Sequence, residues 1–158
     1  MRLTKLEHAA LVIEDSGQKL YIDPGKFTTP ITESSGTVAV VITHEHDDHW
    51  TPDQLARITE ANPDARILGP AGVALAAADF PVETVEAGDR FEVGPFRLRF
   101  FGGLHAVIHR SIPVIDNLGV LVNEALYYGG DSFTVPEDVA VQVLAAPAGA
   151  PWMKIAES

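Results

Sequence analysis

The sequence contains no cysteine among its 158 residues, so neither disulfide bridges nor thiolate metal ligands are available to it. Any transition-metal site must therefore be built from histidine nitrogens and carboxylate oxygens, which suit zinc, manganese or iron. The length suits a single domain, residues 1–158, with one hydrophobic core.

Long apolar runs are also lacking. The stretch Val38–Ile42 is typical of the strongly apolar segments, and it is far shorter than the roughly 20 residues that cross a bilayer. Near the N-terminus, Arg2 and Lys5 are followed by the polar pair Glu7 and His8, which does not fit a signal peptide. We therefore expect a cytoplasmic protein with no membrane partner.

Basic residues are scarce, because 11 Lys and Arg face 22 Asp and Glu and give a net charge of −11. Most of such a surface would repel a phosphate backbone, although a local patch could still bind one. No nucleic-acid partner is expected, and some of the acidic residues are expected to hold divalent cations.

Apolar segments bounded by turn residues dominate both ends of the chain, with helical patterns between them. This order favours an α/β layered sandwich over a barrel of repeated βαβ units. Loops are expected over residues 26–36 and 104–117, the second lying over the site, and a further helix is expected to start at Pro151. We expect strands at 9–14, 19–22, 37–43, 65–68, 82–85, 90–93, 95–101, 118–122, 126–128 and 139–144, and helices from residue 51 and at 71–78.

The strongest chemical signal is the cluster His44-x-His46-x-Asp48-His49, which holds three of the six histidines. It follows the strand predicted at 37–43, which reads as buried on both faces. It precedes a helix in which Thr51 suits the N-cap, Pro52 the first helical position, and Gln54 a capping box.

Metal-competent side chains at this spacing can serve two neighbouring ions. If the extended geometry persists, His44 and His46 project from one face, while Asp48 and His49 lie beyond the turn and reach an adjacent position. A polar turn with chance histidines is the alternative, and the clustering on a turn anchored at both ends weighs against it.

Other candidate residues carry weaker signals when taken alone. His105 follows a strand and a glycine pair and equally suits a core or loop histidine, and Asp131 alone better suits a turn or cap. His109 could contact substrate or orient a ligand, or be a plain loop residue. His8 lies beside an apolar strand, where most histidines are structural, and Asn117 suits substrate binding and turn formation equally.

The histidine cluster after an apolar strand resembles the signature of the metallo-β-lactamase superfamily. The segments Asp23–Gly25 and Tyr128–Ser132 resemble its early motif and its bridging-aspartate segment, and His105 its third histidine. The run His105–His109 resembles the branch that includes ascorbate-6-phosphate-lactonase-like hydrolases. The resemblance covers residues 8–152 and implies a C-terminally incomplete αββα sandwich.

The resemblance implies a two-metal site in which a metal-bound hydroxide is the nucleophile, because zinc lowers the pKa of bound water to about 7. It implies one or two zinc ions, with manganese or iron as alternatives. Asp48 and His109 are the candidate catalytic residues, and a histidine at the position of His8 approaches the site in this branch. The implied metal ligands are His44, His46 and His105 at the first site, Asp48 and His49 at the second, and Asp131 between them.

One departure from the superfamily pattern concerns its last histidine, since none follows His109 in this sequence. The chain also ends soon after Trp152, so a closing helix and strand are expected to be missing. We therefore expect one firmly bound metal and one weakly bound or absent, and an apolar edge that favours a homo-oligomer.

The leading functional hypothesis is a metal-dependent hydrolase acting on a small ester, lactone, amide or phosphoester. The substrate class rests on analogy, because one fold serves many chemistries. A metal-binding or assembly protein with an incomplete, inactive site is the main alternative. A nuclease is less favoured because of the charge, and an iron redox role lacks any flavin or electron-transfer motif. β-Lactamase activity is not implied.

Overall fold

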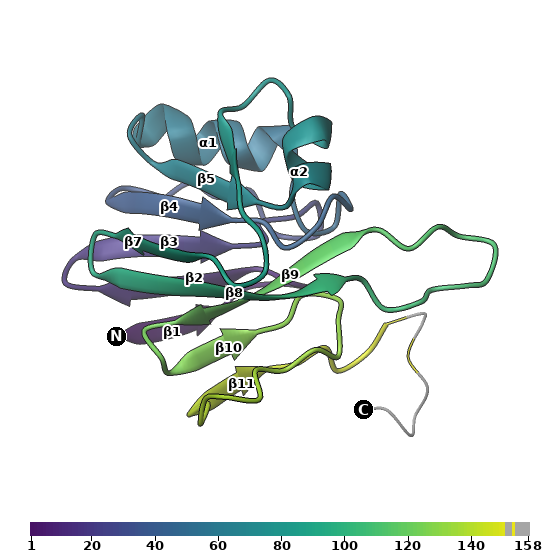
Figure 1. The fold of residues 1–158 in the computed structure, drawn as a ribbon. Helices are drawn as coiled ribbons and strands as arrows, with labels where there is room; N and C mark the ends of the chain where they lie inside the picture. The colour runs from purple at the N-terminus through teal and green to yellow at the C-terminus, as the bar shows by residue number, and fades with distance from the viewer. Residues whose placement is uncertain (151–152, 154–158) are drawn as a thin grey trace.

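Two β-sheets pack face to face in the computed structural model, which describes residues 1–150 and 153. Figure 1 shows both helices on the outer face of the first sheet. This is the layered α/β sandwich that the sequence predicted, and no helix of the described residues covers the second sheet's outer face. The first sheet has the order β1 (Arg2–Lys5), β2 (Leu11–Asp15), β3 (Gln18–Ile22), β4 (Thr37–Val41), β5 (Arg66–Gly69), β6 (Val82–Thr84); the second has β11 (Val143–Ala145), β10 (Leu126–Tyr128), β9 (Asp116–Val122), β8 (Phe96–Leu104), β7 (Arg90–Val93); the helices are α1 (Pro52–Ala61) and α2 (Ala71–Ala76).

The central strands of the first sheet are buried on both faces, and the alternation of their side chains explains how. On β2, Leu11 and Ile13 pack into the core between the sheets, whereas Val12 packs into the core beneath the helices. On β4, Val41 and Val40 divide between the same two cores. A strand with two buried faces reads as a continuous apolar run, as predicted for residues 37–43.

Helix α1 begins as predicted, but Gln54 does not complete a capping box. The Gln54 backbone N–H donates to Thr51 Oγ1 at 3.2 Å, and Pro52 occupies the first turn. The Gln54 side chain instead accepts from Ile31 N and donates to the Thr28 carbonyl, both at 3.0 Å. Half of the prediction is therefore wrong, because the buried backbone of the loop before β4 needs these partners.

The largest differences from the sequence prediction lie in three places. Strand β1 was not expected, because its exposed residues lack apolar alternation, yet it pairs antiparallel with β2. The loop predicted at 104–117 is shorter, since β8 runs to Leu104 and β9 begins at Asp116. The last strand, predicted at 139–144, is β11, which pairs parallel with β10. The helix predicted from Pro151 lies outside the described residues.

Neither helix could cross a membrane. The longer of the two, α1, has 10 residues, and a search of residues 1–150 and 153 finds no helix that is long and apolar enough to do so.

Candidate metal centre

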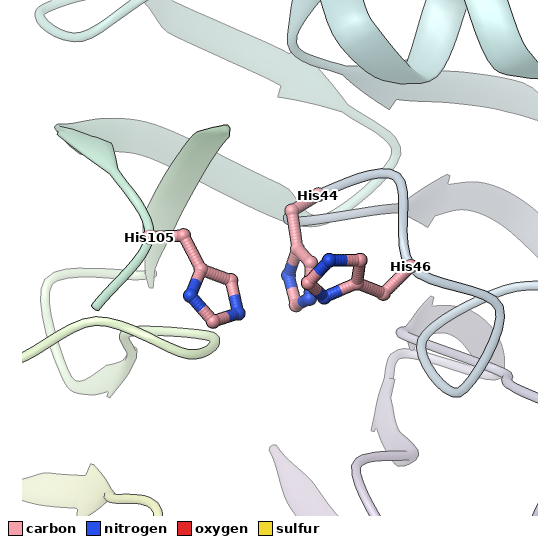
Figure 2. Close-up of side chains that lie close together, drawn as sticks. All are labelled: His44, His46 and His105. Atoms are coloured by element: carbon pink, nitrogen blue, oxygen red, sulfur yellow. The ribbon is translucent and has the colours of Figure 1, made fainter. Parts of the chain in front are cut away.

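The sandwich brings the predicted ligands to one edge of the two sheets. His44, His46, Asp48 and His49 lie on the loop between β4 and α1, whereas His105 directly follows β8 on the opposite sheet. Figure 2 shows the imidazoles of His44 and His46 on one side and that of His105 on the other, converging on the same space. Ligand atoms of these three histidines all lie within 4.8 Å of one another.

His44 is fully buried and stays neutral. Burial, reinforced by the neighbouring His49, lowers the pKa of His44 to about 2. Its Nδ1 lies 3.0 Å from Thr43 Oγ1, whereas its buried Nε2 has no hydrogen-bond partner within the described part of the chain. Buried nitrogens without partners are rare, and a metal ion would satisfy this one.

The tautomer of His105 is fixed by its own loop. His105 Nδ1 lies 2.6 Å from the carbonyl oxygen of Ala106, so it must carry the proton that it donates. The other nitrogen, Nε2, faces Asp131 Oδ2 at 3.4 Å. Such a backbone partner is the arrangement that orients metal-bound histidines.

Asp131 lies between two groups of histidines. Its Oδ1 is 3.5 Å from His49 Nε2, and its Oδ2 is 3.4 Å from His105 Nε2. Burial alone would raise the pKa of Asp131, but the neighbouring imidazoles of His105 and His49 lower it to about 2. Each oxygen of this ionised carboxylate therefore faces a different group, as a bridging ligand requires.

Asn117 supports this bridging position. The buried amide accepts from Asp131 N at 3.0 Å through its Oδ1 and donates to the Gly129 carbonyl at 2.8 Å. The Asp131 carbonyl in turn accepts from Ala106 N at 2.8 Å. The sequence left open whether Asn117 binds substrate or shapes a turn, and these contacts show that it holds the turn carrying Asp131.

A second group of potential ligands forms beside the first. Ligand atoms of His8, Asp48 and His49 lie within 4.8 Å of one another, and those of His44, His49 and Asp131 do so as well. His8 Nε2 is 2.9 Å from Asp48 Oδ2, and His49 Nε2 is 4.0 Å from the same oxygen.

Asp23 holds Thr43 and His49 by hydrogen bonds, and the sequence alone assigned it no individual role. It is fully buried, and its Oδ2 accepts from His49 Nδ1 and from Thr43 Oγ1, both at 2.7 Å. Its Oδ1 accepts from Thr43 N at 2.8 Å. Asp23 thus directs His49 Nε2 toward Asp48 and Asp131. The only sequence signal was an Asp-Pro-Gly turn after a strand.

A cavity of about 490 Å³ opens over these groups. Its walls include Tyr128, Ile108, the segment 145–150 and five of the six metal-ligand candidates, namely His46, Asp48, His49, His105 and Asp131. His109 is not among the lining residues; its exposed imidazole lies 2.7 Å from Ser111 Oγ. The structure therefore brings together the six predicted metal ligands but not His109.

Comparison with known proteins agrees with this geometry. The family described as "Beta-lactamase superfamily domain" matches residues 2–157. The chain belongs to the metallo-β-lactamase superfamily. A protein from Mycobacterium tuberculosis strain H37Rv is 38% identical over 163 aligned positions, which cover 100% of this chain and 76% of the relative.

Less similar proteins also match most of this chain. A UPF0173 metal-dependent hydrolase from Aeropyrum pernix is 31% identical over 150 positions, covering 83% of this chain and 61% of that protein. The chain therefore spans less than two thirds of the archaeal relative. The crystal structure of a protein from Parabacteroides distasonis superposes with a TM-score of 0.79 at 17% identity, covering 98% of this chain and 73% of that one. This last likeness shows the fold.

Proposed function

We propose that this chain hydrolyses a small ester, lactone, amide or phosphoester with the help of one or two divalent metal ions. The family and the name of the Aeropyrum relative indicate a metal-dependent hydrolase. The observation that carries the proposal is the position of Asp131, whose two carboxylate oxygens face His49 and His105 in different groups of potential ligands.

The donors fit such ions. The neutral, buried His44 offers an Nε2 that lacks a hydrogen-bond partner among the described residues, and Asp131 offers an ionised carboxylate. The Nδ1 atoms of His49 and His105 are bonded to Asp23 and to the Ala106 carbonyl, which leaves their Nε2 atoms to a metal ion. A bound divalent ion lowers the pKa of coordinated water and polarises a carbonyl or phosphoryl oxygen. We propose zinc, with manganese or iron as alternatives. The proposed ligands are His44, His46 and His105 for one ion, Asp48 and His49 for the other, and Asp131 for both.

The cavity limits the substrate to a small molecule. About 490 Å³ falls within the roughly 300–1,000 Å³ of typical small-molecule pockets. Ile108 and the alanines of segment 145–150 add apolar lining to the polar ligand groups, against which the apolar part of a substrate would pack. The net charge of −11 argues against nucleic acid as the substrate.

Two residues remain proposed participants in catalysis. Asp48 lines the cavity and is partly exposed, so it can meet both substrate and metal. His109 lies on the loop between β8 and β9, where Ile108 already contributes to the cavity wall. We therefore propose that His109 meets a bound substrate from this loop and does not hold metal.

Elemental analysis of the purified 158-residue protein tests the proposal, with His44→Ala as its control. We expect near-stoichiometric zinc, manganese or iron that is lost in the variant, and turnover of at least one ester, lactone, amide or phosphoester that is lost with it. Folded protein that takes up none of these ions would contradict the proposal. Bound metal without turnover of any class would favour a metal-binding or assembly role.

A further inference from the structure

His8 lies far from the other ligands in sequence but beside them in space. It occupies the turn between β1 and β2, 40 residues before Asp48, and its Nε2 lies 2.9 Å from Asp48 Oδ2. Two ligands held about 2.0–2.1 Å from one ion at angles of 90–109° are about 2.9–3.4 Å apart. The separation of these two atoms therefore suits a shared ion.

We infer that His8 is a ligand of the second metal, which it holds together with Asp48 and His49. The inference rests on the proposed function, because it assumes that a metal ion binds here. Two imidazoles and one carboxylate form a ligand set that catalytic zinc and non-haem iron sites use. His8 is the further imidazole that the described residues bring to this group.

The backbone around His8 is bent to present its side chain. His8 has φ of 52°, in the left-handed region that non-glycine residues rarely adopt and that often marks a functional site. Hydrogen bonds from Leu6 N to the Ala10 carbonyl, at 3.0 Å, and from Ala10 N to the Glu7 carbonyl, at 3.2 Å, close the turn. Lys5 Nζ also donates to the carbonyl of His8.

The His8 imidazole packs against two neighbouring rings, and a hydrogen bond connects its turn to the loop after β3. The edge-on ring of Phe27 lies 5.1 Å from that of His8, and the ring of His49 lies 5.8 Å from it. Glu7 accepts from Thr29 Oγ1 at 3.0 Å and so ties the turn to the segment that carries Phe27. These contacts orient the His8 imidazole toward Asp48 before any ion binds, as a preorganised ligand requires.

The alternative is that His8 only donates a hydrogen bond to Asp48 and so positions the carboxylate. NMR of the wild-type protein, labelled with ¹⁵N-histidine and loaded with ¹¹³Cd²⁺, separates the two roles. A ligand nitrogen couples to cadmium through its bond to the metal, whereas a hydrogen-bond donor does not. We expect cadmium coupling for His8 in addition to His44, His46, His49 and His105.

Coupling of those four histidines without His8 would overturn this inference alone. If no histidine coupled to cadmium and the protein also bound no Zn²⁺, the metal centre and with it the proposed function would fail.

Zn²⁺ titration of variants provides an independent test. We expect His8→Ala to weaken binding of the second Zn²⁺ equivalent by about 100-fold or more. Loss of a residue that only hydrogen-bonds to a metal ligand typically weakens metal binding by about 10–100-fold. His8→Gln keeps an amide that can donate to Asp48, and we expect it not to restore affinity. His109→Ala serves as the matched control for metal binding, because this exposed histidine lies outside the ligand groups. Restoration by Gln, or unchanged affinity in His8→Ala, would overturn the inference.

Discussion

The buried carboxylate of Asp23 lies 2.7 Å from His49 Nδ1 and accepts a hydrogen bond from it, which leaves His49 Nε2 directed at the proposed metal site. Water cannot replace this contact, because the exposed fraction of Asp23 is 0% and that of His49 is 2%. The orientation of a candidate ligand on the loop after β4 is thus decided by a residue that follows β3.

The variant Asp23→Asn tests this orientation. The amide nitrogen introduced by this substitution would donate toward His49 Nδ1, so the proton of His49 would move to Nε2 and block the metal-binding lone pair. We expect about 10–100-fold weaker binding of the second Zn²⁺ equivalent, measured by calorimetric titration. Asp64→Asn, at an exposed position, is the matched control. Unchanged affinity in Asp23→Asn would show that Asp23 does not orient His49.

The neutrality of His44 predicts how the stability of the metal-free protein depends on pH. Because burial lowers the folded-state pKa of His44 from 6.5 to about 2, the unfolded state binds the additional proton between these values. This contribution to stability is present above pH 6.5 and is lost as the pH falls below it, by up to about 1.4 kcal/mol per pH unit.

Urea unfolding of the metal-free protein between pH 7 and pH 5 measures this effect against His44→Gln, which cannot titrate. The free energy of unfolding of the wild type is expected to fall more steeply toward pH 5 than that of the variant. Parallel curves would mean that His44 is not held neutral in the folded protein.

Gly25 is required by the approach of two loops. A Cβ at this position would lie 1.7 Å from the carbonyl oxygen of Asp48, and that contact is to backbone that cannot swing away. Gly25→Ala is expected to lower the free energy of unfolding by about 1–3 kcal/mol or more and to displace Asp48 from the second site. Thermal unfolding and zinc content measure the two effects. Gly149→Ala is the control, because a Cβ there meets nothing within 4 Å.

Gln54 stabilises the loop before β4 without touching the metal centre. Removing its side chain leaves the buried N–H of Ile31 and the Thr28 carbonyl without their partner. We expect Gln54→Ala to lower the free energy of unfolding by about 1–3 kcal/mol while zinc content is unchanged. The exposed Gln142→Ala is the control for urea denaturation. Loss of zinc in Gln54→Ala would instead link this loop to the site.

The resemblance to the superfamily was confirmed, and local patterns explain why it was visible. His44, His46, Asp48 and His49 fall within six consecutive positions after a continuous apolar strand, so their proximity needs no long-range information. The roles of His105 and Asp131 depended on the resemblance, because each alone suits an ordinary loop or turn. The sandwich then places both within reach of the cluster.

Local sequence patterns were sufficient to specify most of the strands, the start of α1 and the motif, because apolar periodicity and capping act between near neighbours. The packing of the fold selected which distant side chains serve that motif: Asp23 beneath His49, Asn117 behind Asp131, and His8 beside Asp48. It also turned Gln54 from a cap residue into an anchor for a loop. These contacts join separate strands and turns, and a buried polar group takes whichever partner the packed fold brings within reach.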